Sequence, residues 1–226
     1  MASGYLPGRC RWVGCDSIYS SIKDAVKNKS TIETLYCNVK LFGSCDGLVY
    51  LWDDSKKLLF LRNPATKQQK IIPKSSEKYT KDDIHMYGFG YDCKIDEYKV
   101  IHVVKLDETN KDNRCLIDVY TLRKNAWKSS HAELDMHIMV PWNRDIGVLV
   151  NGVLHWSGKR DFKVIITLDI SEEKLQEMEP PKGAIENGNI LRTVGALEGL
   201  LCLLVVNKVD LGVWGDAGLR RPRILD

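Results

Sequence analysis

The stretch Gly147–Met178, GVLVNGVLHWSGKRDFKVIITLDISEEKLQEM, reads as a complete four-stranded antiparallel unit. The apolar run Val148–Val150 is followed by Asn151-Gly152, a dipeptide typical of a type I′ turn, which needs positive φ at both central residues. The later strands and turns are Val153–Trp156, a polar turn at Ser157–Asp161, Lys163–Leu168, a turn at Asp169–Glu173, and Lys174–Met178. One sheet of this kind cannot bury both of its faces, so neighbouring units are expected.

Turns of the same kind recur along the chain. Gly47, Glu97, Gly152 and Gly199 each mark a turn before an apolar run, and they fall roughly fifty residues apart. A period near fifty with four short strands per unit is typical of the blades of a kelch-type β-propeller. The sequence therefore predicts an all-β, propeller-type array of about four blades.

The strands of the other units follow from the same pattern. The first unit comprises Lys40–Ser44, Leu48–Trp52, Leu58–Arg62 and Lys70–Ile72. The second comprises His85–Tyr91, Tyr98–Leu106, Arg114–Leu122 and Ala126–Ser129. The fourth has only Arg192–Ala196, Leu200–Val206 and Asp210–Trp214. Because the glycines and proline after Trp214 disfavour a strand, the array is expected to be incomplete.

The ends of the chain are predicted to differ from the array. Residues 1–39 form a lead segment with one short helix over residues 17–27, because Ile18, Ile22, Ala25 and Val26 share one helical face. The propeller-like domain spans residues 40–215, and residues 216–226 are predicted to be a disordered tail. Since the last unit lacks a strand, we expect the isolated chain to aggregate or to depend on a partner.

Composition restricts the partners. The 226 residues are 44% apolar and carry a formal charge of +3, which implies neither a nucleic-acid partner nor an anionic membrane surface. The longest apolar run, Leu200–Val206, is too short to span a bilayer. Seven cysteines without regular spacing, and the absence of a secretory pattern at the start, predict a cytoplasmic or nuclear location.

Several residues invite a catalytic or metal-binding interpretation. Cys45 lies in a G-x-C-x-G motif, but a strand follows it where a nucleophile elbow needs a helix. His155 is better explained as a partly buried side chain bonded to the backbone, and Gly88 and Gly90 as sites of close packing or of a bulge within a strand. The remaining candidates are metal ligands without a completing set: Cys10 and Cys15; His131 and His137; and the turn carboxylates Asp92, Asp96, Glu97, Asp107, Glu108 and Asp112. No catalytic, cofactor-binding or metal-binding residue is therefore predicted.

Four tryptophans recur at strand ends or starts: Trp52, Trp127, Trp156 and Trp214. Stacking on a ligand is one interpretation. Packing between blades is the simpler one, because blades bury both faces and need bulky side chains.

The ordered motifs of the units resemble the plant F-box-associated domain over roughly residues 41–214. They are Gly43–Leu48, Asn63–Thr66, Gly88–Asp92 with Asp96–Val100, Val119–Leu122 with Trp127, Asn151–Trp156, and Leu168-Asp169 with Glu173-Lys174. In that family the domain follows an F-box, which docks on a Skp-type adaptor of a cullin–RING ubiquitin ligase. The associated domain captures the protein to be ubiquitinated.

Two departures shape what the resemblance implies. The F-box, with its Leu-rich helices, is not found around Leu6-Pro7, and the residues after Trp214 differ from the family's usual continuation. We therefore expect a family member truncated at both ends, with an adaptor partner only if an F-box is supplied elsewhere.

The resemblance implies a non-enzymatic protein-interaction module whose partner is a target protein for ubiquitination. Loops on a rigid scaffold carry recognition, so the candidate loops are Asp53–Lys57, Asp107–Asn113, Ser157–Asp161 and Asn207–Val209. The alternative is a propeller enzyme or a carbohydrate-binding domain, since the architecture hosts both.

Overall fold

The computed structural model describes residues 39–76, 83–105, 114–134, 145–158, 164–180, 190–197, 199–206 and 211–215. Every element of regular secondary structure within these ranges is a β-strand, which confirms the all-β prediction. The predicted helix 17–27 and the predicted tail 216–226 lie outside the described residues.

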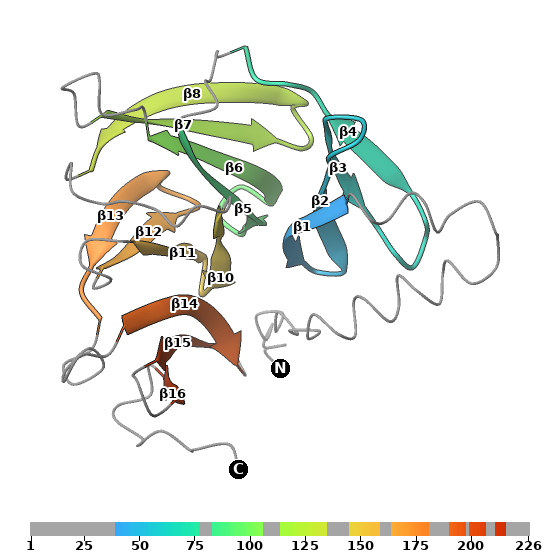
Figure 1. Ribbon diagram of the computed structural model, residues 1–226. Helices are drawn as coiled ribbons and strands as arrows, with labels where there is room; N and C mark the ends of the chain where they lie inside the picture. Colours follow the sequence, from blue (N-terminus) through green and yellow to red (C-terminus); the bar gives the residue numbers. More distant parts are fainter. Residues whose placement is uncertain are drawn as a thin grey trace, which may run out of the picture.

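The strands form four separate sheets in chain order, here called blades, which are antiparallel except where β9 joins blade 2 (Figure 1). Blade 1 contains β1 (Val39–Cys45), β2 (Leu48–Asp53), β3 (Leu58–Arg62) and β4 (Gln69–Ile72). Blade 2 contains β5 (Ile84–Asp92), β6 (Glu97–Lys105), β7 (Arg114–Thr121), β8 (Ala126–Glu133) and β9 (Asp145–Ile146). Blade 3 contains β10 (Val148–Val150), β11 (Val153–Gly158), β12 (Val164–Asp169) and β13 (Lys174–Met178). Blade 4 contains β14 (Ile190–Leu197), β15 (Leu200–Val206) and β16 (Leu211–Gly215).

Three details correct the sequence interpretation. The predicted turn at Ser157–Asp161 is wrong at its start, because Ser157 and Gly158 pair with Ile165 and Val164 and extend β11. Strand β8 continues to Glu133, beyond the predicted end at Ser129. Strand β9 was not predicted, and it adds to blade 2 by pairing in parallel with β5.

The tight turns have the backbone that their sequences predict. Asp46 and Gly47 have φ of 48° and 79°, and Asn151 and Gly152 have 49° and 79°, as a type I′ hairpin requires. A longer turn recurs at residues 54–57, 93–96, 122–125 and 170–173. In each case its last residue is left-handed but is not glycine: Lys57, Asp96, Asn125 and Glu173.

Three apolar clusters join the blades into an arc (Figure 1). Phe42, Tyr50 and Leu61 of blade 1 pack with Phe89 and Tyr120 of blade 2. A second cluster joins blades 2 and 3, and a third, around Ile165 and Leu203, joins blades 3 and 4. The core therefore lies between the sheets, as in a propeller.

Trp156 is the largest fully buried side chain of the second cluster. Its Nε1 donates to the Tyr87 carbonyl of blade 2 at 3.0 Å, and the Gly147 amide donates to the same oxygen at 2.6 Å. Trp127 of blade 2 donates in the same way to the Pro73 carbonyl after blade 1, at 2.7 Å. These contacts confirm the packing role predicted for both indoles. Trp52 also packs against the cluster shared by blades 1 and 2, and its Nε1 donates within its own turn, to Asp54.

Candidate functional site

The meander divides the turns between two rims. Antiparallel strands reverse direction at each turn, so alternate connections lie at the same end of the blades. One end, here called the tight-turn rim, carries the connections β1–β2, β3–β4, β5–β6, β7–β8, β10–β11, β12–β13 and β14–β15. The opposite end, the long-loop rim, carries the β2–β3 turn and the strand ends that flank residues 106–113, 159–163 and 207–210. The β2–β3 turn and the strand ends that flank the other three loops predicted for binding therefore lie on the long-loop rim. Only the β2–β3 turn is fully described.

The β2–β3 turn is held rigid by its own carboxylates. Asp53 Oδ1 accepts from the amides of Ser55 and Lys56, each at 3.0 Å. Asp54 accepts from Trp52 Nε1 at 3.1 Å and from Lys57 Nζ at 2.9 Å, and the hydrogen bond from Lys57 lowers the pKa of the Asp54 carboxyl. The Lys56 and Lys57 side chains are 59% and 62% exposed, and each pairs with a carboxylate of the same turn, Asp53 at 3.6 Å and Asp54 at 2.9 Å. The turn therefore presents two exposed ion pairs on a fixed backbone.

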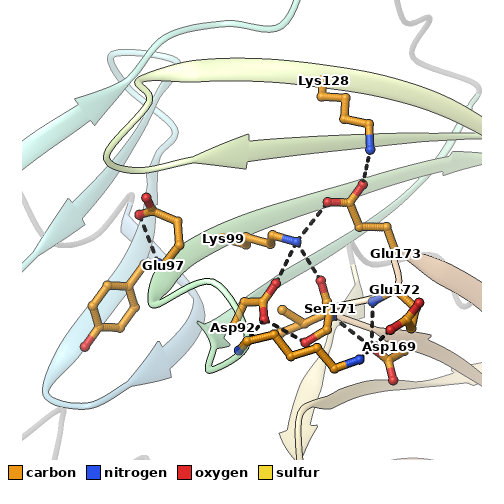
Figure 2. A network of polar contacts seen from close by, with 11 residues as sticks. Asp92, Glu97, Lys99, Lys128, Asp169, Ser171, Glu172 and Glu173 are labelled. Atoms are coloured by element: carbon orange, nitrogen blue, oxygen red, sulfur yellow. Dashed lines mark hydrogen bonds and ion pairs between the residues drawn. The ribbon is translucent and has the colours of Figure 1, made fainter.

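The tight-turn rim is closed between blades 2 and 3 by a buried network of charges (Figure 2). Lys99 of β6 lies at its centre, with Nζ 2.9 Å from both Asp92 Oδ2 and Glu173 Oε1 and 2.9 Å from the Ile170 carbonyl. Ser171 Oγ donates to Asp92 Oδ1 at 2.7 Å. The network therefore joins the end of β5 to the β12–β13 turn.

Ion pairs of two exposed lysines extend this network toward the surface. Lys128 Nζ of β8 binds the other Glu173 oxygen at 2.7 Å, and Lys94 pairs with Glu172. Two cations and two carboxylates meet around Glu173 and Asp92, so the formal charges of this group cancel.

The pKa directions identify the network as structural. Burial raises the pKa of Asp92, but hydrogen bonds from Ser171 and Lys99 outweigh burial, and the net pKa is lowered. The same balance lowers the pKa of Glu173, where Lys128 and Lys99 donate. Burial opposes the charge of Lys99, yet its two carboxylate partners raise its pKa. All three groups keep their ordinary charges at neutral pH, whereas a general acid or base needs a pKa near the working pH.

Blade 1 joins the same rim through smaller contacts. Tyr98 donates its hydroxyl to Asp46 at 3.3 Å, and burial raises the pKa of Tyr98 to about 12. Lys70 Nζ donates to the Leu122 carbonyl at 3.0 Å. Glu97, 7% exposed, accepts from the Arg123 amide at 3.0 Å. Asp92 and Glu97, predicted to be polar turn carboxylates, are buried and serve as ion-pair and capping groups.

The remaining sequence candidates have structural roles where they are described. Cys45 ends β1 and is followed by β2, without the helix of an elbow. His155 Nδ1 lies 3.3 Å from the Val148 carbonyl and is buried, as predicted. A Cβ at Gly88 or Gly90 would lie 2.4 Å from Leu154 or 2.5 Å from Ile170, which confirms close packing. His131 lies on β8 and is exposed; Cys10, Cys15, Asp107, Glu108, Asp112 and His137 lie outside the described residues.

One polar cluster was missed by the sequence analysis. His85 Nδ1 and His102 Nε2 are 3.0 Å apart, and His102 stacks on Tyr87, which stacks on Phe42 of blade 1. Tyr87, His102, Asp118 and Ser129 are consecutive cross-strand partners, and Ser129 Oγ donates to Asp118 at 2.6 Å. The alternation of side chains along a strand could have predicted that these four residues share one face of the sheet. It could not have predicted that the Asp118 carboxylate on this face is buried.

The described ranges show neither a metal-binding cluster nor a membrane-spanning helix. No group of three or more His, Cys, Asp or Glu side chains within them could hold a metal ion. The same ranges contain no helix with the length and hydropathy to cross a bilayer.

The fold agrees with what the chain resembles among known proteins. The family model described as the F-box associated beta propeller domain matches residues 13–214, so the match also includes part of the predicted lead segment. F-box protein CPR1 of Arabidopsis thaliana is 30% identical over 217 residues, covering 84% of this chain and 52% of that protein. An F-box/kelch-repeat protein of the same plant is also 30% identical, over 77% of this chain and 48% of that protein.

The chain spans about half the length of the curated relatives it matches. The family match covers most of its sequence and includes all four blades. The chain belongs to the F-box associated beta propeller family.

Proposed function

We propose that this chain is a non-enzymatic, target-binding module of an F-box-type ubiquitin ligase component, acting in the cytoplasm or nucleus. The family match over residues 13–214 carries the proposal. Relatives named as F-box proteins support it. A Skp-type adaptor would join only through an F-box supplied elsewhere. Free thiols at Cys93 and Cys115 suit a reducing compartment.

The proposal places the target on the long-loop rim. On the tight-turn rim, the charges around Lys99 pair between blades 2 and 3, and Glu97 pairs within blade 2. The long-loop rim instead offers the rigid β2–β3 turn with exposed Lys56 and Lys57, beside loops that are longer in the sequence. Rigid turns bind at low entropic cost, and the exposed ion pairs of this turn offer charged groups to a polar segment of the target.

The ligase connection is tested by affinity capture from plant extract. The bait is this chain, compared with a version that carries an added F-box. We expect both baits to recover the same target proteins and only the second to recover a Skp-type adaptor and a cullin. Recovery of the adaptor by the unmodified chain would contradict the proposed division of roles.

The position of the binding surface is tested with charge reversals on the two rims. Lys56→Glu with Lys57→Glu alters the long-loop rim, and Lys124→Glu alters an exposed position of the β7–β8 turn on the tight-turn rim. The double variant should lose captured targets, whereas Lys124→Glu should retain them. The reverse pattern would move the binding surface to the other rim.

A further inference from the structure

Two histidines lie in the joint between blades 1 and 2. His85 of β5 and His102 of β6 share a face of blade 2 with Phe89, which belongs to the apolar cluster that blade 2 forms with blade 1. His102 is only 5% exposed, and His85 is half-buried. The two imidazoles are therefore part of the contact between the blades.

The two rings meet end to end. His85 Nδ1 and His102 Nε2 are 3.0 Å apart, the ring centroids are 5.2 Å apart, and the ring planes differ by 20°. The centroid separation is close to the nitrogen–nitrogen contact plus the two ring radii, so the two nitrogens point at each other. This is the geometry of an N–H···N hydrogen bond. A metal ion in line between the nitrogens would need two bonds of about 2 Å each, which a gap of 3.0 Å does not allow.

The hydrogen bond limits how many protons the pair can hold. A neutral imidazole has one N–H group, and an imidazolium has two. Only one proton can lie between the facing nitrogens, because two N–H groups that point at each other across 3.0 Å repel. The joined pair therefore accepts at most one proton beyond its neutral form, whereas two separated imidazoles accept two.

The charged surroundings also suit no more than one added proton. Asp118 of β7 is fully buried and is the cross-strand partner of His102, and Ser129 Oγ of β8 donates to its carboxylate at 2.6 Å. The other titratable or charged side chains described on or beside the long-loop half of the two facing sheet surfaces are Asp83, Tyr87, Arg114, His131, Glu133, Lys40 and Tyr50. One lysine and one arginine match the two carboxylates of this set in number, which leaves Asp118 to balance one positive charge on the pair.

A stack of rings connects the pair to blade 1. Tyr87 lies against both histidines, with its centroid 4.5 Å from that of His102 and 6.3 Å from that of His85. On its other side Tyr87 stacks on Phe42 of β1 at 4.3 Å, and Phe42 is 1% exposed. Two imidazolium rings repel each other, and burying an unpaired charge is costly, so one ring must turn toward water. Whichever ring turns, packing on Tyr87 is lost, and the contact with blade 1 is weakened.

We propose that the His85–His102 pair is an acid-sensitive latch between blades 1 and 2, closed while it holds at most one added proton and opened by a second. Separated histidines have a pKa near 6.5, so well below that pH the opened pair binds more protons than the closed pair. Stability that the closed contact provides at neutral pH is then lost as pH falls, and the opened population rises at least about tenfold per pH unit below about pH 5.5. This window lies above the pH at which the lowered pKa values of Asp92 and Glu173 take effect.

The test follows hydrogen exchange of the β1 and β2 amides in the full chain, corrected for intrinsic exchange. We expect protection to fall at least about tenfold between about pH 5.5 and 4.5. In the double variant His85→Gln/His102→Gln, in which neither side chain titrates, the fall should stay below about twofold. His131→Gln is the matched control, because it removes an exposed ring from the same face of blade 2, and it should behave as the parent does. An equal fall in the double variant and in the parent would overturn the proposal.

Heteronuclear NMR of the ring nitrogens in the parent chain counts the protons directly, and it keeps the proposal testable if the double variant fails to fold. While the β1 and β5 amides keep their native signals, we expect at most one of the two rings to be protonated as the pH is lowered. Two protonated rings in a chain whose blade 1 amides remain protected would overturn the proposal.

Discussion

At the scale of single residues, Lys99 is a buried cation that is held by two carboxylates. Its side chain is 4% exposed and contacts two carboxylates, of which Asp92 is 1% exposed. Removing one partner of a buried ion pair leaves uncompensated charge in a poorly solvated site. The cost therefore exceeds what the lost Coulomb attraction alone would suggest.

We expect Lys99→Met to lower the free energy of unfolding by about 3–5 kcal/mol, because Asp92 and Glu173 lose their shared cation. Lys128→Met is the matched control. Its side chain contacts the same Glu173 but is 70% exposed, so its loss should be much smaller. Urea unfolding of the two variants measures the difference. Equal losses would show that Lys99 does not hold the two blades together.

Gly147 is constrained by its neighbour. A Cβ at this position would lie 2.7 Å from the Trp156 indole, and that ring is fully buried and tied to the Tyr87 carbonyl. We expect Gly147→Ala to lower the free energy of unfolding by about 2–3 kcal/mol through overpacking. Gly195→Ala is the control, because a Cβ there meets nothing within 4 Å. If Gly147→Ala leaves the free energy of unfolding unchanged, the Trp156 indole can shift to make room for the methyl group.

The sequence predicted that tryptophan side chains pack between the blades, but it did not predict the buried ion pairs of Lys99. Trp156 is large and apolar, and a propeller needs such residues between blades, so its role followed from composition and repeat. The partners of Lys99 lie far away in the chain; Glu173 is 74 positions distant. Nothing in the local pattern of Asp92 or Glu173 distinguishes a buried ion pair from an ordinary turn carboxylate.

At the scale of elements, the turns decide the register of each blade. Asn151-Gly152 and Asp46-Gly47 were recognisable because few residues tolerate positive φ at both central positions. Strand β9 has only two residues and carries no periodicity to detect. Ser157-Gly158 looked like a turn by composition, but pairing with β12 outweighed that preference.

Two opposite substitutions test the backbone of the turns. Gly47 has a φ of 79° with open space around a Cβ, so Gly47→Ala should cost about 1 kcal/mol from conformation alone. Lys67 has a φ of 61° without glycine's freedom, so Lys67→Gly should be neutral or raise stability by up to about 1 kcal/mol. Thermal unfolding gives the sign of each change. A gain from Gly47→Ala would contradict the left-handed turn.

At the scale of the whole molecule, the charge network makes the union of blades 2 and 3 depend on pH. The pKa values of Asp92 and Glu173 are lowered by folding. Such groups stabilise the folded state above their unfolded pKa values, near pH 4, and this stabilisation is lost as pH falls through the lower folded values. The raised pKa of Lys99 adds stability that is lost only above about pH 10.

We therefore expect a stability plateau at intermediate pH and a decline below about pH 4. In Lys99→Met the carboxylates lose the cation that lowers their pKa values, so the acid-side decline should shrink. Urea unfolding between pH 3 and 7 for the parent and the variant measures this. An identical pH profile for both would show that other groups control the acid sensitivity.

Blade 4 lies at the far end of the arc, and its outer face bears on whether the chain self-associates in solution. Val194 and Leu203 of blade 4 pack on blade 3, so the alternate positions Gly195, Leu200 and Cys202 form the outer face of this blade. Leu200 is 40% exposed, and a Cβ at Gly195 would meet open space. An exposed apolar side chain on the face of a blade favours association.

We expect the chain to self-associate through this face at micromolar concentration, with light scattering after size exclusion showing species larger than a monomer. Leu200→Lys places a charge on the face and should shift the population toward monomer, because burying an unpaired ammonium is costly. Ile95→Lys is the matched control, since Ile95 is 52% exposed in the β5–β6 turn on the tight-turn rim. A parent chain that is monomeric throughout, or equal effects of both variants, would show that the end of the arc is stable on its own.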